Sequence, residues 1–185
     1  LVSGDTSVTL TQSGAYSSPN AGTGISITMA DSLGGTTASG ASAATNYTLT
    51  QPTVTGTIAQ APLNLTISKT YNNDAGFSSS NTYSLSGTTY GSDGLASAMT
   101  IASGSATVSS VNAATYSGFS TNSLVLSNSN YAINGGSTIS ATINKATLTV
   151  TGTTSPSRGY DSTTNATISG GSLSGLVSGL SLIHI

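Results

Sequence analysis

The charged residues are the first candidates for chemistry, because the chain has so few of them. Its 185 residues include only three Lys or Arg and five Asp or Glu. Arg158 and Asp161 nevertheless lie close together and flank Tyr160, in the segment SPSRGYDSTTNAT. A guanidinium, a carboxylate and a phenol at this spacing could form an active site or could anchor a turn. The rest of the sequence has to decide between these two interpretations.

The residue types that common catalytic sites need are scarce or dispersed. A Ser-His-Asp triad needs a histidine, and the only one is His184, next to the last residue. The acidic residues are too scattered to predict a converging acid–base pair: Asp5, Asp31, Asp74, Asp93 and Asp161. The segment 92–94, SDG, is a lone fragment of a calcium loop, and no phosphate-binding loop occurs. We therefore predict no enzyme activity, no catalytic residue, no cofactor and no metal.

The composition also excludes several partners. Nucleic-acid binding needs clustered basic residues, whereas Lys69, Lys145 and Arg158 are far apart and the net charge is −2. The absence of Cys excludes disulfides and thiolate sites. No apolar run approaches the roughly 20 residues that span a bilayer as a helix. We predict no nucleic-acid partner and no membrane span, and we expect any signal peptide of an exported parent to lie upstream of this fragment.

The elements that position these residues are predicted to be β-strands, because apolar and polar residues alternate with period two. In LNLTIS, Leu63, Leu65 and Ile67 share one face of a strand. The same alternation occurs in SVTL, GISITM, SLVLS, STISATI and ATLTVTG. Turns are predicted at Gly34-Gly35, Asn72-Asn73 and Gly135-Gly136. The segment 93–104 is the best candidate for a helix, but we favour a strand or loop there. The predicted fold class is therefore all-β.

The sequence repeats itself at intervals of about 85–90 residues. The recurring pairs are NYTL at 46–49 with NYAI at 130–133, TIAQAPLNL at 57–65 with TINKATLTV at 142–150, KTYNN at 69–73 with RGYDS at 158–162, and NAGTGI at 20–25 with NAATYS at 112–117. Because their order is the same in each copy, the repeats predict three modules. Residues 1–61 form the C-terminal part of a first repeat, 62–146 a complete second repeat, and 147–185 the truncated start of a third.

Short junctions between the repeats predict tandem small antiparallel β modules in an elongated array. An immunoglobulin-like sandwich is the favoured fold of each module. A β-grasp-like module is the alternative, and it would need a helix that only 93–103 could supply. The last five residues, SLIHI at 181–185, resemble translated sequencing-adapter read-through, and we interpret them as non-native.

The order of these motifs resembles that of the YDG domain and of its relative, the MBG domain. The matching segments are Arg158-Gly159-Tyr160-Asp161, Gly4-Asp5 with Val8 and Leu10, Asn20 to Gly24, Asn46-Tyr47-Thr48-Leu49 as a strand, and Thr57 to Leu65. The middle repeat departs from the pattern, with Tyr71-Asn72-Asn73 in place of Tyr-Asp-Gly. Domains of this kind occur as tandem repeats in very large secreted bacterial proteins of the filamentous-haemagglutinin type. The resemblance implies a β-rich stalk module and carries over no catalytic residue.

The repeat signature is predicted to be structural. Its residues are Lys69, Tyr71, Asn72, Arg158, Tyr160, Asp161, Asn46, Tyr47, Asn130 and Tyr131. Tyr47 and Tyr131 are expected to pack at the same point of their modules, and so are Tyr71 and Tyr160, with sugar stacking as the alternative role. The charges beside the last two tyrosines are expected to anchor a turn.

These observations favour a non-catalytic stalk segment of a large adhesin, secreted to the bacterial cell surface and associated with the outer membrane. Its role would be that of a spacer that displays a distal binding region. The alternative is that the repeats themselves bind host surface glycans or proteins, or copies of the same protein in a biofilm. A fragment of a hydrolase is a distant third hypothesis.

Overall fold

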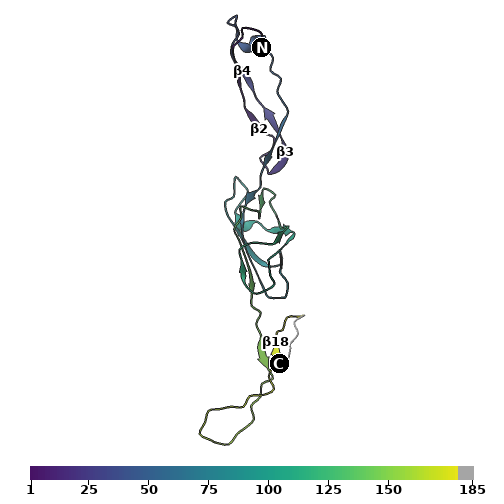
Figure 1. Ribbon diagram of the computed structural model, residues 1–185, viewed down its shortest axis with the longest axis vertical. Helices are drawn as coiled ribbons and strands as arrows, with labels where there is room; N and C mark the ends of the chain where they lie inside the picture. The colour runs from purple at the N-terminus through teal and green to yellow at the C-terminus, as the bar shows by residue number, and fades with distance from the viewer. Residues whose placement is uncertain (179–185) are drawn as a thin grey trace. The chain divides into compact units, whose positions relative to one another are not determined.

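The computed structural model describes residues 1–178 and is nearly all β, which confirms the predicted fold class (Figure 1). His184 and the segment 181–185 lie outside the described residues. The chain divides into two compact units. Unit 1 comprises Leu1–Ala61 and Ser129–Tyr131, and unit 2 comprises Pro62–Asn128 and Ala132–Ile185, as far as they are described. One division falls between Ala61 and Pro62, where the repeats place a boundary, whereas no division separates 147–178 from the middle repeat.

Unit 1 contains two small antiparallel sheets and one turn of helix, α1 (Ala43–Asn46). The first sheet pairs β1 (Ser7–Thr11) with β4 (Ser32–Thr36). The second sheet has the order β2-β3-β5, with the bounds β2 (Gly14–Tyr16), β3 (Gly22–Met29) and β5 (Val54–Ile58). The alternating segments SVTL and GISITM therefore form strands, as their pattern predicts.

Two predictions for unit 1 are wrong. Gly34-Gly35 forms no turn but lies within β4, where Gly35 has a φ of +77°. A Cβ atom on Gly35 would lie 1.8 Å from the carbonyl oxygen of Ser7, so glycine allows the two strands to approach. The expected strand at 46–49 is absent, because the chain forms α1 up to Asn46 and the amide of Tyr47 donates to the oxygen of Ala43 at 2.9 Å. Tyr47 is already extended, with φ −130° and ψ 141°, so the strand is absent because residues 47–49 pair with no other described strand.

Unit 2 contains one mixed sheet and three smaller antiparallel ones. The mixed sheet has the order β12-β16-β7-β9, and the smaller ones are β13-β11-β8, β10-β14 and β17-β18. The bounds are β7 (Asn64–Thr70), β8 (Gly76–Ser78), β9 (Thr82–Ser86), β10 (Ile101–Ser103), β11 (Ser105–Thr107), β12 (Thr115–Tyr116), β13 (Thr121–Asn122), β14 (Val125–Leu126), β16 (Ile139–Asn144), β17 (Thr149–Thr151) and β18 (Ser172–Ser174). The two-residue strands β6 (Ala61–Pro62) and β15 (Tyr131–Ala132) each contain a point where the chain passes between units.

Most strand pairs of the described residues are antiparallel, as expected of the modules, and the central pair of the mixed sheet is the exception. Strands β7 and β16 are parallel, in register from Leu65 opposite Ile139 to Thr70 opposite Asn144. Adjacent parallel strands need a long crossover, and here nearly the whole module forms it. An immunoglobulin-like sandwich has antiparallel sheets. The parallel pair β7–β16 therefore departs from the favoured fold.

The β-grasp alternative lacks its helix within the described residues. The segment 93–104 contains only the 3-10 turn η1 (Ala96–Ala98), followed by strand β10. The preference for loop and strand over helix in this segment is therefore confirmed. The predicted turns at Asn72-Asn73 and Gly135-Gly136 are also present, the second closed by the amide of Ser137 donating to the oxygen of Asn134 at 2.9 Å.

The hydrophobic core lies almost entirely in the middle repeat. Leu63, Leu65 and Ile67 are fully buried, as their alternation predicts. They belong to a core that also includes Phe77, Leu85, Ile101, Ala106, Val108, Leu126, Ile133, Ala141 and Ile143. Alternation also predicts a strand at 147–151, but its apolar residues Leu148 and Val150 are exposed. The alternation of apolar and polar residues therefore predicts a strand correctly in both segments. It does not predict burial, which depends on whether other strands cover the apolar face.

Candidate functional site

The signature segment of the middle repeat forms a turn between β7 and β8 that is closed by a lysine. The Lys69 ammonium donates to the carbonyl oxygen of Gly76 at 2.7 Å and contacts Oδ2 of Asp74 at 3.2 Å. It also lies 5.2 Å from the centre of the Phe77 ring. The Lys69 side chain is only 6% exposed, so these contacts replace its lost hydration. Hydrogen bonds from the Gly76 amide and, next, from Lys69 lower the pKa of Asp74.

The second signature segment, at 158–163, forms a turn of the same kind on the surface. The Arg158 guanidinium pairs with the Asp161 carboxylate and donates to Oγ1 of Thr163 at 3.1 Å. The Arg158 pairing, followed by hydrogen bonds from Thr163, lowers the pKa of Asp161. Both signature ion pairs therefore anchor a turn.

The two turns each contain one residue in the left-handed conformation. Asn73 and Ser162 are the two non-glycine residues in 1–178 with a positive φ, at 60° and 59°. Each follows the signature tyrosine by two residues, and each side chain hydrogen-bonds the hydroxyl of that tyrosine, Tyr71 or Tyr160. The residue five positions after the cation, Asp74 or Thr163, accepts a hydrogen bond from it in both turns. The sequence match between 69–73 and 158–162 therefore reflects a common local structure.

The expectation that Tyr160 packs as Tyr71 does is wrong. Tyr160 is 96% exposed, whereas Tyr71 is half-buried. The conformation of the turn depends on contacts within the segment, so the turn forms even where no other strand packs against it. The packing of its tyrosine needs other strands of the module, and among the described residues only the middle repeat supplies them.

Tyr47 and Asn46 lie in a small polar cluster of unit 1. The Tyr47 hydroxyl donates to Oδ2 of Asp5 at 2.6 Å and accepts from the amide of Val2 at 2.7 Å. The Ala38 amide, at 2.6 Å, and then Tyr47 lower the pKa of Asp5, while the carboxylate raises the pKa of Tyr47. Nδ2 of Asn46 donates to Oγ1 of Thr37 at 3.3 Å. This cluster ties the start of the chain to β4 and α1.

Asn130 and Tyr131, which are predicted to correspond to Asn46 and Tyr47, have different surroundings. The Asn130 side chain accepts from the amide of Ala21 at 2.9 Å and donates to Oδ1 of Asn20 at 3.2 Å. Tyr131 is fully buried, whereas Tyr47 is half-buried. The two tyrosines therefore do not pack to the same depth.

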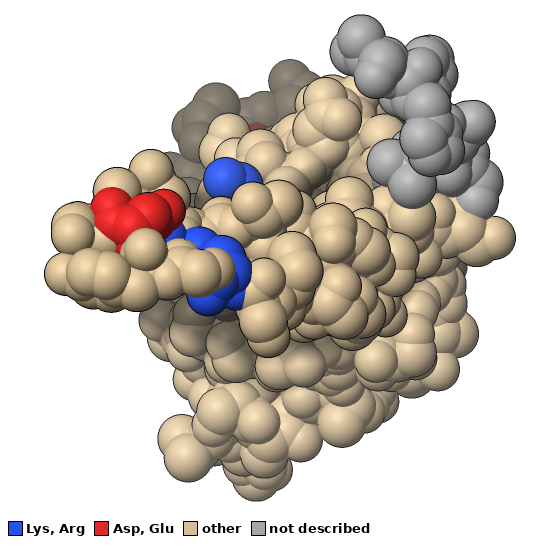
Figure 2. Space-filling view, turned by 90° about the horizontal axis from the view of Figure 1, so that it is seen from below, with Lys and Arg blue, Asp and Glu red and all other residues tan. Residues whose placement is uncertain are grey.

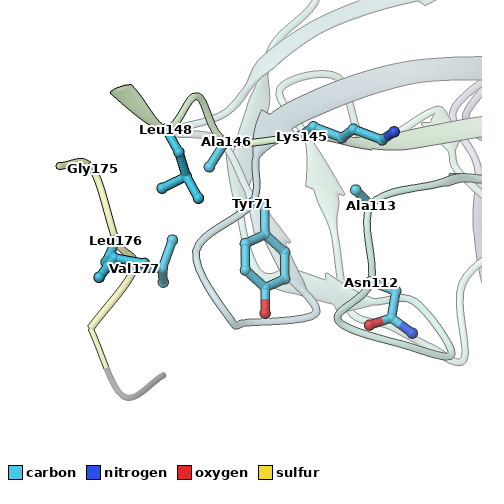
Figure 3. A pocket seen from close by; sticks show the side chains of 9 residues that line it. All are labelled: Tyr71, Asn112, Ala113, Lys145, Ala146, Leu148, Gly175, Leu176 and Val177. Carbon is cyan, nitrogen blue, oxygen red and sulfur yellow. The ribbon is translucent and has the colours of Figure 1, made fainter. Parts of the chain in front are cut away.

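A pocket of about 340 Å³ in unit 2 surrounds the signature residue Tyr71. Figure 3 shows Tyr71 projecting between Leu148 and Val177 on one side and Asn112 and Ala113 on the other. The remaining lining residues are Lys145, Ala146, Gly175 and Leu176. An aromatic ring, an amide, an amine and aliphatic side chains can contact a sugar ring by stacking and hydrogen bonds. Of the other signature residues, Lys69 and Asn72 line a separate shallow pocket with Asp74.

The antiparallel pair β17–β18 is equivalent to the antiparallel pair β7–β9. Both pairs contain a motif that is not among the repeats predicted from the sequence. Ser84-Leu85-Ser86-Gly87 recurs as Ser172-Leu173-Ser174-Gly175. Leu65 lies opposite Leu85 in one hairpin, and Val150 lies opposite Leu173 in the other. The motif SLSG could have been found as a fifth match at the same spacing.

The closing glycines of the two hairpins also have equivalent neighbours. Gly87 and Gly175 both have positive φ. A Cβ atom added to either glycine would meet a carbonyl oxygen and the Cδ2 atom of a leucine, both from the residues just before the first strand of the pair. These residues are Pro62 and Leu63 for Gly87, and Thr147 and Leu148 for Gly175.

A second equivalence links unit 1 to the middle repeat. In unit 1, Gly22 pairs with Ile58 where β3 meets β5. In the middle repeat the corresponding residues, Ala114 and Ile143, are joined by a backbone hydrogen bond of 2.9 Å beside the pair β12–β16. The turn before each segment is also shared, because the amides of Asn20 and Asn112 each donate to the hydroxyl of the serine two residues earlier.

Charged groups are sparse on the molecular surface. Figure 2 shows a face that is almost entirely uncharged, with acidic and basic groups adjacent at one place. In residues 1–178, no three His, Cys, Asp or Glu side chains gather as metal ligands would. This part of the chain also has no helix with the length and hydrophobicity of a membrane span. No family model, no curated protein and no solved structure matches the chain.

Proposed function

We propose that this chain is a non-catalytic repeat segment from the stalk of a large, exported bacterial surface adhesin, related to the YDG and MBG domains. The observation that supports the proposal is that one pair of strands recurs with an equivalent register, as β7–β9 in the middle repeat and as β17–β18 in the later one. A repeat that preserves backbone pairing and no set of reactive side chains is typical of a structural array. The segment acts as a spacer that holds a distal binding region away from the cell.

The arrangement of the middle repeat suits a spacer under tension. Strand β7 begins the module and strand β16 ends it, and the two are parallel neighbours. A pull on the two ends of the module therefore slides these strands along each other. Their evenly spaced hydrogen bonds then share the load and must break together, which raises the force that the module resists.

Single-molecule force spectroscopy of the full chain tests the spacer role. Pulling from the two termini is expected to give one strong unfolding event, with a length gain of roughly 280 Å for the segment from β7 to β16. The control is a pull between cysteines introduced at Asn64 and Ser86, which opens the antiparallel pair β7–β9 from one end. If both geometries give equally weak events, the spacer proposal fails.

The Tyr71 pocket favours a second candidate function, in which the repeat binds a neutral glycan. The pocket combines an aromatic ring with the Asn112 amide, and Lys145 is the one charged residue among the described residues that line it. The test is binding of the full chain to a glycan array, with Tyr71→Ala and Asn112→Ala as pocket variants. The matched control is Tyr160→Ala, since Tyr160 is exposed and does not line the pocket. Binding that both pocket variants lose and the control keeps would support this function against a pure spacer.

A further inference from the structure

We propose that the turn 134–137, between β15 and β16, is a site of covalent self-modification. At this site the side chain of Asn134 loses its amide nitrogen and becomes an aspartyl or isoaspartyl residue. Asn134 is the only asparagine in the sequence that a glycine follows. The turn belongs to unit 2 and comes directly after Ile133, which is buried in the core. The inference does not depend on the proposed function.

The nucleophile is the backbone nitrogen of Gly135. Asn134 and Gly135 are both exposed, and within residues 1–178 the Gly135 amide donates to no other group. A Cβ atom on Gly135 would meet nothing within 4 Å, so the space around this nitrogen is open to solvent bases. Because the nitrogen and the Asn134 carboxamide belong to adjacent residues, their reaction closes a small ring and needs no encounter of separate molecules.

The turn aims a hydrogen-bond donor at the oxygen that gains charge in this reaction. The Gly136 amide donates to Oδ1 of Asn134 at 3.0 Å. When the Gly135 nitrogen attacks Cγ, Oδ1 becomes an oxyanion, and a donor that is already in place stabilises it. The turn is held by the Ser137 amide, which donates to the carbonyl oxygen of Asn134 at 2.9 Å, and by the Asn134 amide, which donates to Oγ of Ser137 at 3.0 Å. Nucleophile, electrophile and oxyanion donor therefore come from consecutive residues.

The reaction consumes only water and releases ammonia. The Gly135 nitrogen gives up its proton and bonds to Cγ of Asn134, while the bond from Cγ to Nδ2 breaks and Nδ2 leaves as ammonia after taking up a proton. The product is a cyclic succinimide. Water then adds to one of its two carbonyl carbons, and the bond from that carbon to the Gly135 nitrogen breaks, so the nitrogen regains a proton. Opening at Cγ gives aspartate, and opening at the main-chain carbonyl carbon gives isoaspartate.

The product alters the turn that leads into β16. Both products add a negative charge, and isoaspartate also lengthens the main chain at the point where the Ser137 amide closes the turn. The next residue, Thr138, donates its amide to Oδ1 of Asn64 at 2.8 Å, at the first residue of β7. Modification therefore acts beside the start of the parallel pair β7–β16. We expect the modified chain to unfold at a lower urea concentration than the fresh chain.

Peptide mapping of the full chain, during storage in mildly alkaline buffer, tests the site. In the folded chain, we expect acid to replace amide at Asn134 at least about tenfold faster than at the exposed Asn72 and Asn112, because side chains on the residues after them hinder attack. Gly135→Ala should slow conversion by a similar factor. Gly118→Ala is the matched control, since both glycines have open space for a Cβ and neither has a positive φ. Conversion at Asn134 no faster than at Asn72, or undiminished in Gly135→Ala, would overturn the proposal.

Unfolding the chain tests the role of the turn. Concentrated urea keeps the sequence but removes the hydrogen bond from the Gly136 amide to Asn134, so conversion should be slower in urea than in the folded chain. Faster conversion in urea would show that the turn protects Asn134, and would refute the role of Gly136 as oxyanion donor.

Labelling of isoaspartate tests the product and its effect. An isoaspartyl methyltransferase with S-adenosylmethionine should methylate the peptide that contains residue 134 in stored wild type and not in stored Gly135→Ala. Asp93-Gly94 can form isoaspartate too, but it lies in another peptide and releases no ammonia. The stored wild type should also have a lower urea midpoint than stored Gly135→Ala. Equal midpoints after full conversion would refute the effect on the turn, and force or glycan measurements bear on none of these results.

Discussion

At the scale of the residue, the scarce charges of this chain serve to close turns. The ammonium of Lys69 is almost fully buried, and the Gly76 carbonyl, the Asp74 carboxylate and the Phe77 ring satisfy it. A buried amine without such partners would be costly. The clustering of charge around a tyrosine, which suggests an active site in the sequence, therefore has a structural cause in the middle repeat. In the later repeat, Arg158 and Asp161 make the same kind of turn at the surface.

The Asp74 carboxylate should make stability depend on pH. Its pKa in the folded chain lies below the ordinary value of 3.8, because Gly76 and Lys69 stabilise the charged form. A group with a lowered folded pKa contributes stability that is present above the unfolded pKa and is lost as pH falls through the folded value. We expect the urea midpoint of unit 2 to fall below about pH 4, and to fall less in Asp74→Asn. Identical acid profiles for the two proteins would contradict this assignment.

Asn73 should tolerate glycine and resist branched residues. Its φ of 60° is a left-handed conformation, which costs most side chains roughly 1–2 kcal/mol. We expect Asn73→Val to lower the free energy of unfolding of unit 2 by about that amount. Asn73→Gly is the control and should leave stability nearly unchanged. Chemical denaturation with urea measures both, and equal losses in the two variants would point to the lost side chain rather than to the backbone.

At the scale of the element, the same hairpin occurs in a covered and an uncovered form. Strands β7 and β17 pair with β9 and β18 in equivalent registers. Among the strands of residues 1–178, β7 has a second neighbour, β16, and β17 has none. The buried core of the middle repeat covers the apolar face of β7. Pairing is thus a property of the local sequence, and burial is a property of the complete module.

Replacing each of two equivalent side chains by alanine measures this difference in burial. Leu65→Ala should destabilise unit 2 by about 2–5 kcal/mol, since it leaves a cavity in a packed core. The equivalent Val150→Ala should change stability by less than about 0.5 kcal/mol in the monomer, because the side chain is exposed. Urea unfolding at a concentration where the chain is monomeric gives both values. A large loss from Val150→Ala under these conditions would mean that the hairpin is covered within a single copy.

At the scale of the whole molecule, the two units differ in how much apolar surface they bury. Nearly all fully buried apolar side chains belong to unit 2, and Ala43 and Tyr131 are the described exceptions. Unit 1 instead depends on strand pairing and on the polar cluster around Asp5. Stability should therefore be distributed unevenly along the chain.

Hydrogen exchange should show this uneven distribution. In the monomer we expect the amides of β7 and β16 to exchange slower than those of β1 to β5 by roughly a hundredfold or more, because the former open only when the core unfolds. Exchange followed by mass spectrometry of peptic fragments makes the comparison. Uniform exchange over both units would contradict the assignment of the core to the middle repeat.

Local patterns in the sequence predicted much of the fold and part of the site. The alternation at 63–68, the turn at Asn72-Asn73 and the correspondence of 69–73 with 158–162 depend on neighbours in the chain, and all three appear in the structure. The turn predicted at Gly34-Gly35 failed because a glycine with positive φ serves a close strand approach equally well. The strand predicted at 46–49 failed because the helical turn reaches Asn46 and the extended residues after it have no described partner strand.

Residue patterns are sufficient to identify a repetitive, all-β chain with charges at its turns, because strand alternation and turn conformation depend on a few neighbouring residues. The parallel pairing of β7 with β16 becomes visible only in the folded chain, since that contact joins positions more than 70 residues apart. The folded chain also decides which of the equivalent side chains are buried. Leu65 and Val150 occupy the same place in the repeat, and what separates them is whether other strands cover them.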